Sequence, residues 1–175
     1  GLRPGDVIQI PHTCSLGNAG WCCYKAGHDY LGALPLTTGT GVVTSSRRQI
    51  EIAQEWGTNV WYVRPEYSTQ LAKVARDELK LDLRDLKFLG CGLGPDTDGA
   101  FAKQIEDLWG CPVYDMYGTH EMGMGSFECQ AKDGMHFMED CTFFEIVDTE
   151  TEAPVPNGTI GNMVCTILHR RLPPM

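Results

Sequence analysis

The stretch Val113-Tyr114-Asp115-Met116-Tyr117-Gly118-Thr119-His120-Glu121 decides both the predicted fold and the predicted site. Its apolar and aromatic first half is typical of a buried strand, and we expect that strand to end at Gly118. Ligands bind α/β sheets where strands end and loops begin. An aromatic ring, a glycine, a hydroxyl and a carboxylate at such an end favour a nucleotide and metal site. The alternative is a strand followed by an ordinary turn.

Three residues of this stretch carry chemistry that suits a nucleotide. The ring of Tyr117 could stack on a base, and Gly118 lets the backbone approach a phosphate. The carboxylate of Glu121 offers oxygen ligands to a hard cation such as Mg²⁺. These residue types therefore predict a site for a phosphorylated ligand with its metal.

Composition narrows the function classes. The chain has 175 residues, 42% of them apolar, which is enough for one domain, or a large part of one, with a normal core. Its net charge of −9 argues against a nucleic-acid partner. No apolar run is long enough for a membrane span, and no signal peptide is visible. Eight scattered cysteines without a Cys-x-x-Cys pair indicate a reducing compartment, the cytoplasm.

Strands and helices are expected to alternate before the organising stretch. Short apolar runs predict strands at 6–10, 33–36 and 59–63, and helical spacing predicts helices at 18–31, 46–56, 65–79 and 97–109. The first helix should bury Ala19, Cys22, Cys23, Ala26 and Tyr30. The second should begin with a capping box from Ser46 to Gln49, bury Ile50, Ala53 and Trp56, and end at Gly57.

The pattern of apolar and turn residues changes after about residue 125. Four further strands separated by turns, among them Asp133-Gly134, predict hairpins rather than crossovers. The fold class is therefore α/β, with a parallel sheet flanked by helices in 1–124 and a β-rich hairpin region in 125–175. A glycine- and threonine-rich loop at 37–44 could cradle phosphate, but it lacks the Gly-Lys-Ser/Thr ending of a P-loop, so a mobile connection is the other interpretation.

Landmarks over nearly the whole chain resemble the phenylacetate–CoA ligase group of adenylate-forming enzymes. They include the opening 1–7, Arg48-Gln49-Ile50, Leu83-Arg84-Asp85-Leu86, Gly92-Leu93-Gly94-Pro95, Tyr114-Asp115-Met116-Tyr117-Gly118 with Glu121, Asp133-Gly134-Met135-His136 with Glu139-Asp140, and the turn 154–158. The resemblance lies in the order and spacing of these motifs rather than in any single one.

The resemblance implies a two-step reaction. A carboxylic acid, aromatic or related, attacks the α-phosphate of ATP to give an acyl-adenylate and pyrophosphate, and coenzyme A then displaces AMP to give a thioester. Gly92, Leu93, Gly94 and Pro95 are similar to the turn that lies against adenine, and Asp115, Tyr117 and Gly118 to the strand end that holds the nucleotide. Glu121 corresponds to the acid that coordinates Mg²⁺.

The chain departs from the family pattern at two places. His120 stands where the family usually has Ser or Thr, with Thr119 one place earlier, so the α-phosphate contact falls to Thr119 or His120. A histidine there could donate to phosphate, titrate or bind metal. The segment that usually carries aromatic residues for the aryl pocket offers His12, Cys14 and Leu16 instead. We therefore expect a smaller or more polar acid than phenylacetate.

A zinc site is a further hypothesis. Cys129, His136 and Cys141 are separated by six and four residues in the hairpin region, and thiolates and imidazole at such spacing can bind Zn²⁺. In some members of the family, a cysteine and a histidine near here resemble half of a zinc site. The alternative is that both cysteines are small buried residues and that His136 is a hydrogen-bonded strand residue.

The resemblance also places the chain as a central slice of an adenylation domain, with the phosphate loop expected upstream and the lysine-bearing C-terminal domain downstream. We expect the chain alone to be inactive. Exposed apolar surface at its ends would favour self-association, for example as a homodimer. Two alternatives stay open: an adenylyltransferase-like relative, and a non-catalytic module that holds zinc or a partner.

Overall fold

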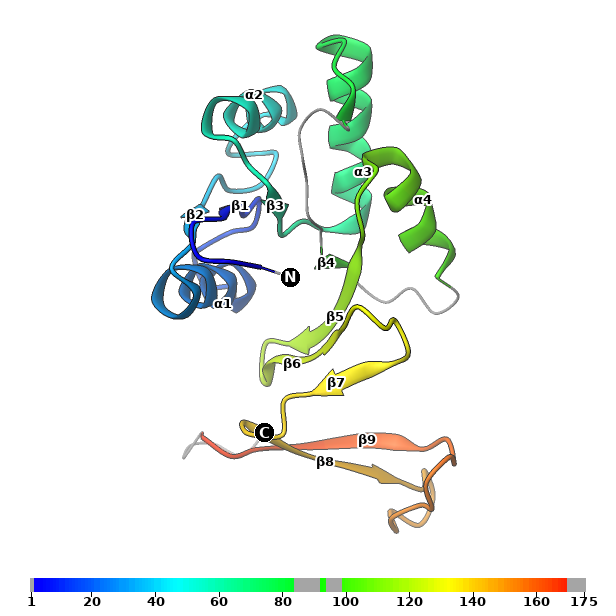
Figure 1. The fold of residues 1–175 in the computed structure, drawn as a ribbon. Helices are drawn as coiled ribbons and strands as arrows, with labels where there is room; N and C mark the ends of the chain where they lie inside the picture. The colour runs from blue at the N-terminus through cyan, green and yellow to red at the C-terminus, as the bar shows by residue number, and fades with distance from the viewer. Residues whose placement is uncertain (1, 84–91, 94–98, 170–175) are drawn as a thin grey trace.

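A computed structural model describes residues 2–83, 92–93 and 99–169 (Figure 1). Strands and helices alternate as far as residue 109, and the elements after it are strands. The elements are β1 (Val7–Gln9), α1 (Asn18–Lys25), η1 (Ala26–Leu31), β2 (Leu34–Leu36), α2 (Ser46–Trp56), β3 (Val60–Trp61), α3 (Pro65–Lys73), η2 (Val74–Glu78), β4 (Gly92–Leu93), α4 (Ala100–Trp109), β5 (Tyr114–Thr119), β6 (Gly123–Glu128), β7 (Met135–Phe137), β8 (Thr142–Val147) and β9 (Asn162–Ile167).

The strands of the described residues form three sheets. Strands β2, β1 and β3 make a parallel sheet in that order, and α1 and α2 lie on its opposite sides (Figure 1). Strand β4 pairs in parallel with β5, which continues through antiparallel pairing into β6 and β7. Strands β8 and β9 form a separate antiparallel hairpin. The predicted fold class is therefore confirmed, although the parallel strands are divided between two sheets.

The predicted division of the chain falls inside one strand. Residues 124 and 125 both belong to β6, which pairs with β5 on one side and with β7 on the other. A boundary at this point stays a prediction. No helix of the described residues is long and apolar enough to cross a membrane.

The first helical segment buries only part of the expected apolar stripe. Cys23 packs against the core around Ile8, and Ala19 and Cys22 are half-buried, whereas Tyr30 is 88% exposed and Ala26 is also exposed. Two glycines, Gly20 and Gly27, are its buried residues. From Ala26 the segment is π-helical, and its wider turn rotates later side chains away from the α-helical face. A Cβ at Gly20 would lie 2.6 Å from the carbonyl oxygen of Thr13, so the helix contacts the preceding loop backbone directly.

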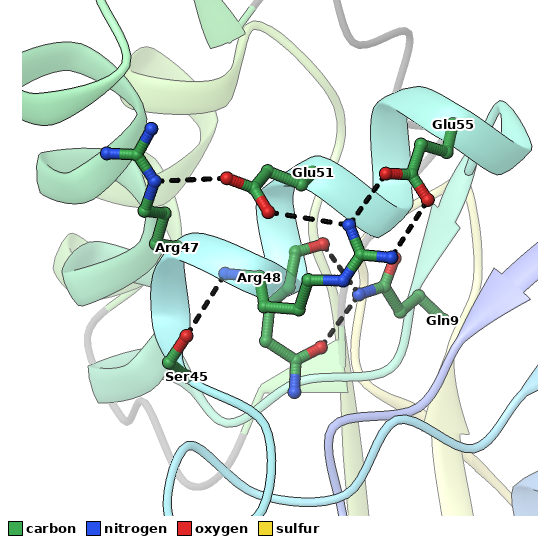
Figure 2. Close-up of polar contacts among 7 residues, drawn as sticks. Gln9, Ser45, Arg47, Arg48, Glu51 and Glu55 are labelled. Atoms are coloured by element: carbon green, nitrogen blue, oxygen red, sulfur yellow. Dashed lines mark hydrogen bonds and ion pairs between the residues drawn. The ribbon is translucent and has the colours of Figure 1, made fainter.

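Helix α2 has the predicted bounds, but its N-cap residue is one position earlier than the capping-box pattern predicted. The hydroxyl of Ser45, not Ser46, accepts a hydrogen bond from the backbone N–H of Arg48 at 3.3 Å (Figure 2). The side chain of Gln49 is fully buried rather than reaching back to the cap. Trp56 is 56% exposed instead of on the buried face, while Gly57 ends the helix with φ +65° as expected.

A buried polar network joins α2 to the parallel sheet. The side-chain amide of Gln9 donates to the backbone oxygen of Gln49 at 2.9 Å and to its side-chain oxygen at 2.7 Å (Figure 2). Thr58 donates to the Gln9 side-chain oxygen at 2.9 Å, and Gln49 donates to the carbonyl of Gly39 at 2.8 Å. Because buried polar groups without partners are costly, this network fixes β1, α2 and the loop at 37–44 together.

The main core lies among α2, α3, η2 and α4. Its buried members include Ile50, Leu71, Ala75, Ile105 and Val113, each of which is 0% exposed. Val113 immediately precedes β5, and its backbone N–H donates to the carboxylate of Glu106 on α4 at 3.0 Å. The core therefore fixes the point from which β5 leaves the helical layer toward the second half of the chain (Figure 1).

Candidate functional site

The organising stretch forms a hairpin, not a strand that ends in a loop. Strand β5 continues through Gly118 to Thr119, and a register shift between Tyr117 and Gly118 bends it against β6. A Cβ at Gly118 would lie 2.3 Å from the carbonyl oxygen of Gly123, so only glycine fits between the two strands. The expectation that the strand ends at Gly118 is therefore wrong, because antiparallel pairing with β6 extends it. Its residues are half-buried or exposed rather than buried.

A cavity of about 410 Å³ lies beside this hairpin. Three segments that are far apart in the sequence form its walls: the loop before α1 with the first turns of that helix, the chain between β3 and α3, and the β5–β6 hairpin. The described lining residues are His12, Asn18, Ala19, Cys22, Tyr62, Val63, Arg64, Pro65, Glu66, Met116, Gly118, Thr119, His120, Gly123 and Met124. The structure thus brings His12, predicted for the acid pocket, to Gly118, Thr119 and His120, predicted for the nucleotide.

The tip of the hairpin is attached to the start of α1. The side-chain amide of Asn18 donates to the backbone oxygens of Thr119 at 3.3 Å and of His120 at 3.1 Å. Within the hairpin, the hydroxyl of Thr119 accepts from the backbone N–H of Met122 at 3.1 Å. Asn18 therefore holds Thr119 and His120, two of the hairpin residues that line the cavity, at a fixed distance from helix α1.

Two aromatic side chains form an uncharged wall of the cavity. The rings of His12 and Tyr62 lie with their centroids 4.8 Å apart. Burial, helped by the positive charge of Arg64, lowers the pKa of His12 to about 4. Burial, helped by Cys23 and Cys22, raises the pKa of Tyr62 to about 12. Both groups are therefore neutral at pH 7, and the hydroxyl of Tyr62 contacts the sulfur of Met124 at 3.6 Å.

The other predicted nucleotide residues are not among the described residues that line the cavity. Tyr117 is 38% exposed and Glu121 is exposed, each directly beside a lining residue. Asp115 is half-buried, and its carboxylate accepts from the backbone N–H of Met116 at 2.7 Å. In β4, Gly92 pairs with Tyr114 and Leu93 with Asp115, next to this strand. Gly94 and Pro95 lie outside the described residues.

Two residues of the predicted acid pocket lie elsewhere. Cys14 is half-buried and does not line the cavity, and Leu16 is 98% exposed. The thiol of Cys14 instead lies near α1, where a Cβ at Gly20 would be 2.8 Å from its sulfur. The tight packing of α1 on this loop turns Cys14 toward the helix and leaves Leu16 at the surface.

The predicted zinc ligands do not converge. Cys129 follows β6, Cys141 precedes β8, and His136 lies in β7 with its ring 5.7 Å from that of Phe127. In the described part of the chain, no group of three histidine, cysteine, aspartate or glutamate side chains is placed to hold a metal ion. The spacing along the chain is compatible with zinc, but the described side chains form no such group, so they do not support that hypothesis.

Four polar residues among the described lining residues have no counterpart in the sequence prediction: Asn18, Tyr62, Arg64 and Glu66. They belong to no motif, because their position depends on which loops meet at one end of the sheet. One signal was available for Arg64. It directly precedes Pro65 at the start of α3, and a residue between a strand and a helix lies at the edge of the sheet where ligands bind.

Curated relatives match the chain from end to end. Phenylacetate–coenzyme A ligase of Pseudomonas putida is 31% identical over 183 aligned residues, and that of Escherichia coli strain K12 is 27% identical over 184. The corresponding ligase of Thermus thermophilus is 29% identical over 184. Each alignment covers 100% of this chain and 39–40% of the relative. The chain therefore spans about 40% of the length of these relatives. No protein-family model matches it.

Solved structures also match nearly the whole chain. A crystal structure of 2-hydroxyisobutyryl-CoA ligase in complex with 2-HIB-AMP and CoA matches with a TM-score of 0.86 and 29% identity, covering 97% of this chain and 38% of that one. The same ligase in the thioesterification state gives 0.87 and 30%, covering 97% and 36%. ATP-bound MatB from Rhodopseudomonas palustris, at 16% identity and a TM-score of 0.67, covers 94% and 32% and shares the fold.

Proposed function

We propose that this chain, which is homologous over its whole length to part of the phenylacetate–CoA ligases, forms the acid- and nucleotide-binding part of an ATP-dependent, AMP-forming acid–CoA ligase. One observation supports this most directly. His12, predicted for the acid, and residues 118–120, predicted for the nucleotide, line one cavity although more than a hundred residues separate them. An enzyme that joins an acid to a nucleotide needs both contacts at the same place.

The proposed reaction has two steps. In the first, an oxygen of the acid's carboxylate attacks the α-phosphorus of ATP, the bond to the bridging oxygen breaks, and pyrophosphate leaves. In the second, the thiolate of coenzyme A attacks the acyl carbon, and AMP leaves. A solved relative that binds both 2-HIB-AMP and CoA supports this order of substrates.

The hairpin supplies the nucleotide contacts in this proposal. The accessible ring of Tyr117 stacks on adenine, and the backbone at Gly118, which carries no side chain, lies alongside the nucleotide. Thr119 and His120 donate hydrogen bonds to the α-phosphate. Asn18 holds their backbone in place, so the donors are positioned before the substrate arrives and need little rearrangement.

Glu121 is the residue that would hold Mg²⁺. Magnesium commonly uses one or two carboxylates, with substrate phosphates and water completing its coordination. One exposed carboxylate beside two phosphate-facing residues fits that requirement, since no ready-made cage of three protein ligands is needed. The ion would neutralise charge as pyrophosphate leaves.

The decisive experiment is acid-dependent ATP–pyrophosphate exchange by the full-length protein. The panel contains aryl, arylacetic, short aliphatic monocarboxylic and dicarboxylic acids. Exchange with one class, followed by thioester formation on adding CoA, supports the proposal. Exchange without thioester would favour an adenylyltransferase-like relative. A folded protein that neither exchanges nor binds ATP would contradict the proposal and favour a non-catalytic module.

Two further features belong to the proposal. The protein acts in the cytoplasm, which is supported by seven cysteines of the described chain that form no disulfide. Self-association as a homodimer is the second, and light scattering of the purified protein tests it.

A further inference from the structure

Arg64 gives the cavity its one permanently charged cation among the described lining residues. It is the N-cap residue of α3, with extended backbone angles of φ −70° and ψ 143°, and the rigid Pro65 follows it. Its backbone is therefore fixed at the end of β3, and its side chain reaches the cavity from that edge. Arg64 is exposed, so the guanidinium keeps its access to solvent and to an entering ligand.

Within the described chain, the guanidinium of Arg64 has no hydrogen-bond or ion-pair partner. By contrast, Arg47, Arg48 and Arg76 each form an ion pair with a carboxylate on their own helix. Glu66 also lines the cavity, but it forms no ion pair with Arg64. An arginine that lines a cavity with its donors unused is suited to an anion that enters that cavity.

The surroundings of Arg64 restrict what that anion can be. His12 and Tyr62 are neutral, and Ala19, Val63 and Met124 add apolar surface. This arrangement matches a short hydrocarbon chain that ends in an anionic group. At Arg64 itself, a single carboxylate fits better than a triphosphate, because one arginine beside Glu66 cannot neutralise several negative charges.

We infer that Arg64 binds a second carboxylate on the acid, so that the substrates are short dicarboxylic acids. This inference rests on the proposed function. One carboxylate faces the hairpin, where activation occurs, and the other forms paired hydrogen bonds with the guanidinium. The methylene groups between them pack against the apolar part of the wall.

The test uses acids matched in carbon number, succinate against butyrate and malonate against propionate, in pyrophosphate exchange by the full-length protein. The measured quantity is the ratio of kcat/KM for the dicarboxylate to that for its monocarboxylate. Arg64→Met is expected to lower this ratio between about 10-fold and 100-fold, because a charged hydrogen-bond partner is lost. Arg64→Lys is expected to lower it less, since the charge remains without the paired donors. Arg47→Met, a matched change on the outer face of α2, should leave the ratio unchanged.

Direct binding of succinate and butyrate, measured by calorimetry, separates this inference from the proposed function. Succinate binding that Arg64→Met weakens, in a protein without exchange activity, would support the inference and contradict the function. Exchange with monocarboxylates only, or a ratio that Arg64→Met does not change, would overturn the inference and keep the function. If Arg64→Met raises the KM for ATP or CoA and does not change the ratio of dicarboxylate to monocarboxylate kcat/KM, the inference is also overturned. Failure to bind either acid would also overturn it. Circular dichroism of each variant confirms that it is folded.

Discussion

The side-chain amide of Asn18 donates a hydrogen bond to the backbone oxygen of His120 over 3.1 Å, although the two residues are 102 positions apart in the sequence. This contact joins the first helix to the hairpin that carries the proposed phosphate donors. Local stability and the geometry of the site therefore depend on the same side chain.

Asn18→Ala should affect catalysis more than stability. We expect a loss of about 1 kcal/mol in the free energy of unfolding, since the bonds are exposed. Exchange activity should fall about 100-fold, because small displacements of positioning groups are costly. Thermal unfolding and pyrophosphate exchange measure the two effects, and Asn157→Ala in an exposed turn is the control. Full activity in a folded Asn18→Ala protein would show that the hairpin tip needs no such tether.

Stability should decrease as the pH falls below neutrality because of His12. The folded-state pKa of His12 is lowered to about 4, whereas the unfolded value is 6.5. Between these values the unfolded chain binds a proton that the folded chain does not. Stability is therefore complete above pH 6.5 and declines by up to about 3 kcal/mol as the pH approaches 4.

Denaturant unfolding from pH 4 to 7 measures this decline. His12→Asn should flatten the dependence, whereas His28→Asn, at an exposed position, should leave it as in the native protein. An equal slope in the native and His12→Asn proteins would assign the acid sensitivity to other groups.

Gly118→Ala should distort the hairpin. The added methyl would lie 2.3 Å from the carbonyl oxygen of Gly123, and the backbone must move to relieve this overlap. We expect a loss of about 3 kcal/mol of stability, typical of a steric conflict with backbone. Gly17→Ala is the matched control, since its methyl meets the hydroxyl of Thr13 at 3.4 Å and its φ is −75°. Comparable losses for both variants in urea unfolding would argue against the close approach of β5 and β6.

Gln9→Leu should destabilise the protein strongly. The change removes the partner of Gln49 and Thr58 inside the core, and buried groups left without partners cost about 1–3 kcal/mol each. We therefore expect a loss of about 3 kcal/mol in urea unfolding. Arg48→Ala removes the neighbouring ion pair with Glu55 on the exposed face of α2 and should have little effect. The reverse order of these two losses would show that the buried network contributes less than the surface pair.

Glu121→Gln should reduce exchange activity about 100-fold and raise the Mg²⁺ concentration that gives half-maximal rate. The amide keeps the shape of the side chain but removes the charge that attracts the cation. Exchange is measured over a Mg²⁺ titration, and Glu139→Gln, in an exposed turn, is the control. An unchanged Mg²⁺ dependence would remove Glu121 from the metal site.

Local signals in the sequence predicted well where the helices end, and less well which of their side chains are buried. Gly57 and Gly110 end their helices as expected, and Pro65 begins α3, because these residues act through their own backbone angles. Tyr30 is exposed because its orientation depends on the π-helical turn from Ala26, which a periodic pattern for a regular helix misses. Trp56 is exposed at the last residue of α2, just before Gly57 ends the helix.

The residues of the site also differ in how far the sequence could predict them. Gly118, Thr119 and His120 form one motif, so the sequence could identify them together, and their hairpin places all three at the cavity. Arg64 and Tyr62 belong to another segment, and only the meeting of three loops reveals them. Cys129, His136 and Cys141 show the reverse case, in which suitable spacing along the chain does not survive strand pairing.

The walls of the cavity extend from His12 to Met124, which has a consequence for protein synthesis. A chain that is still growing on the ribosome cannot contain the cavity until the hairpin has left the exit tunnel and docked on α1. A ligand that binds the cavity therefore stabilises, by mass action, only those chains in which the hairpin has docked on α1. In the cell, supply of that ligand would lengthen the lifetime of these chains against proteolysis and would give nothing to shorter nascent ones.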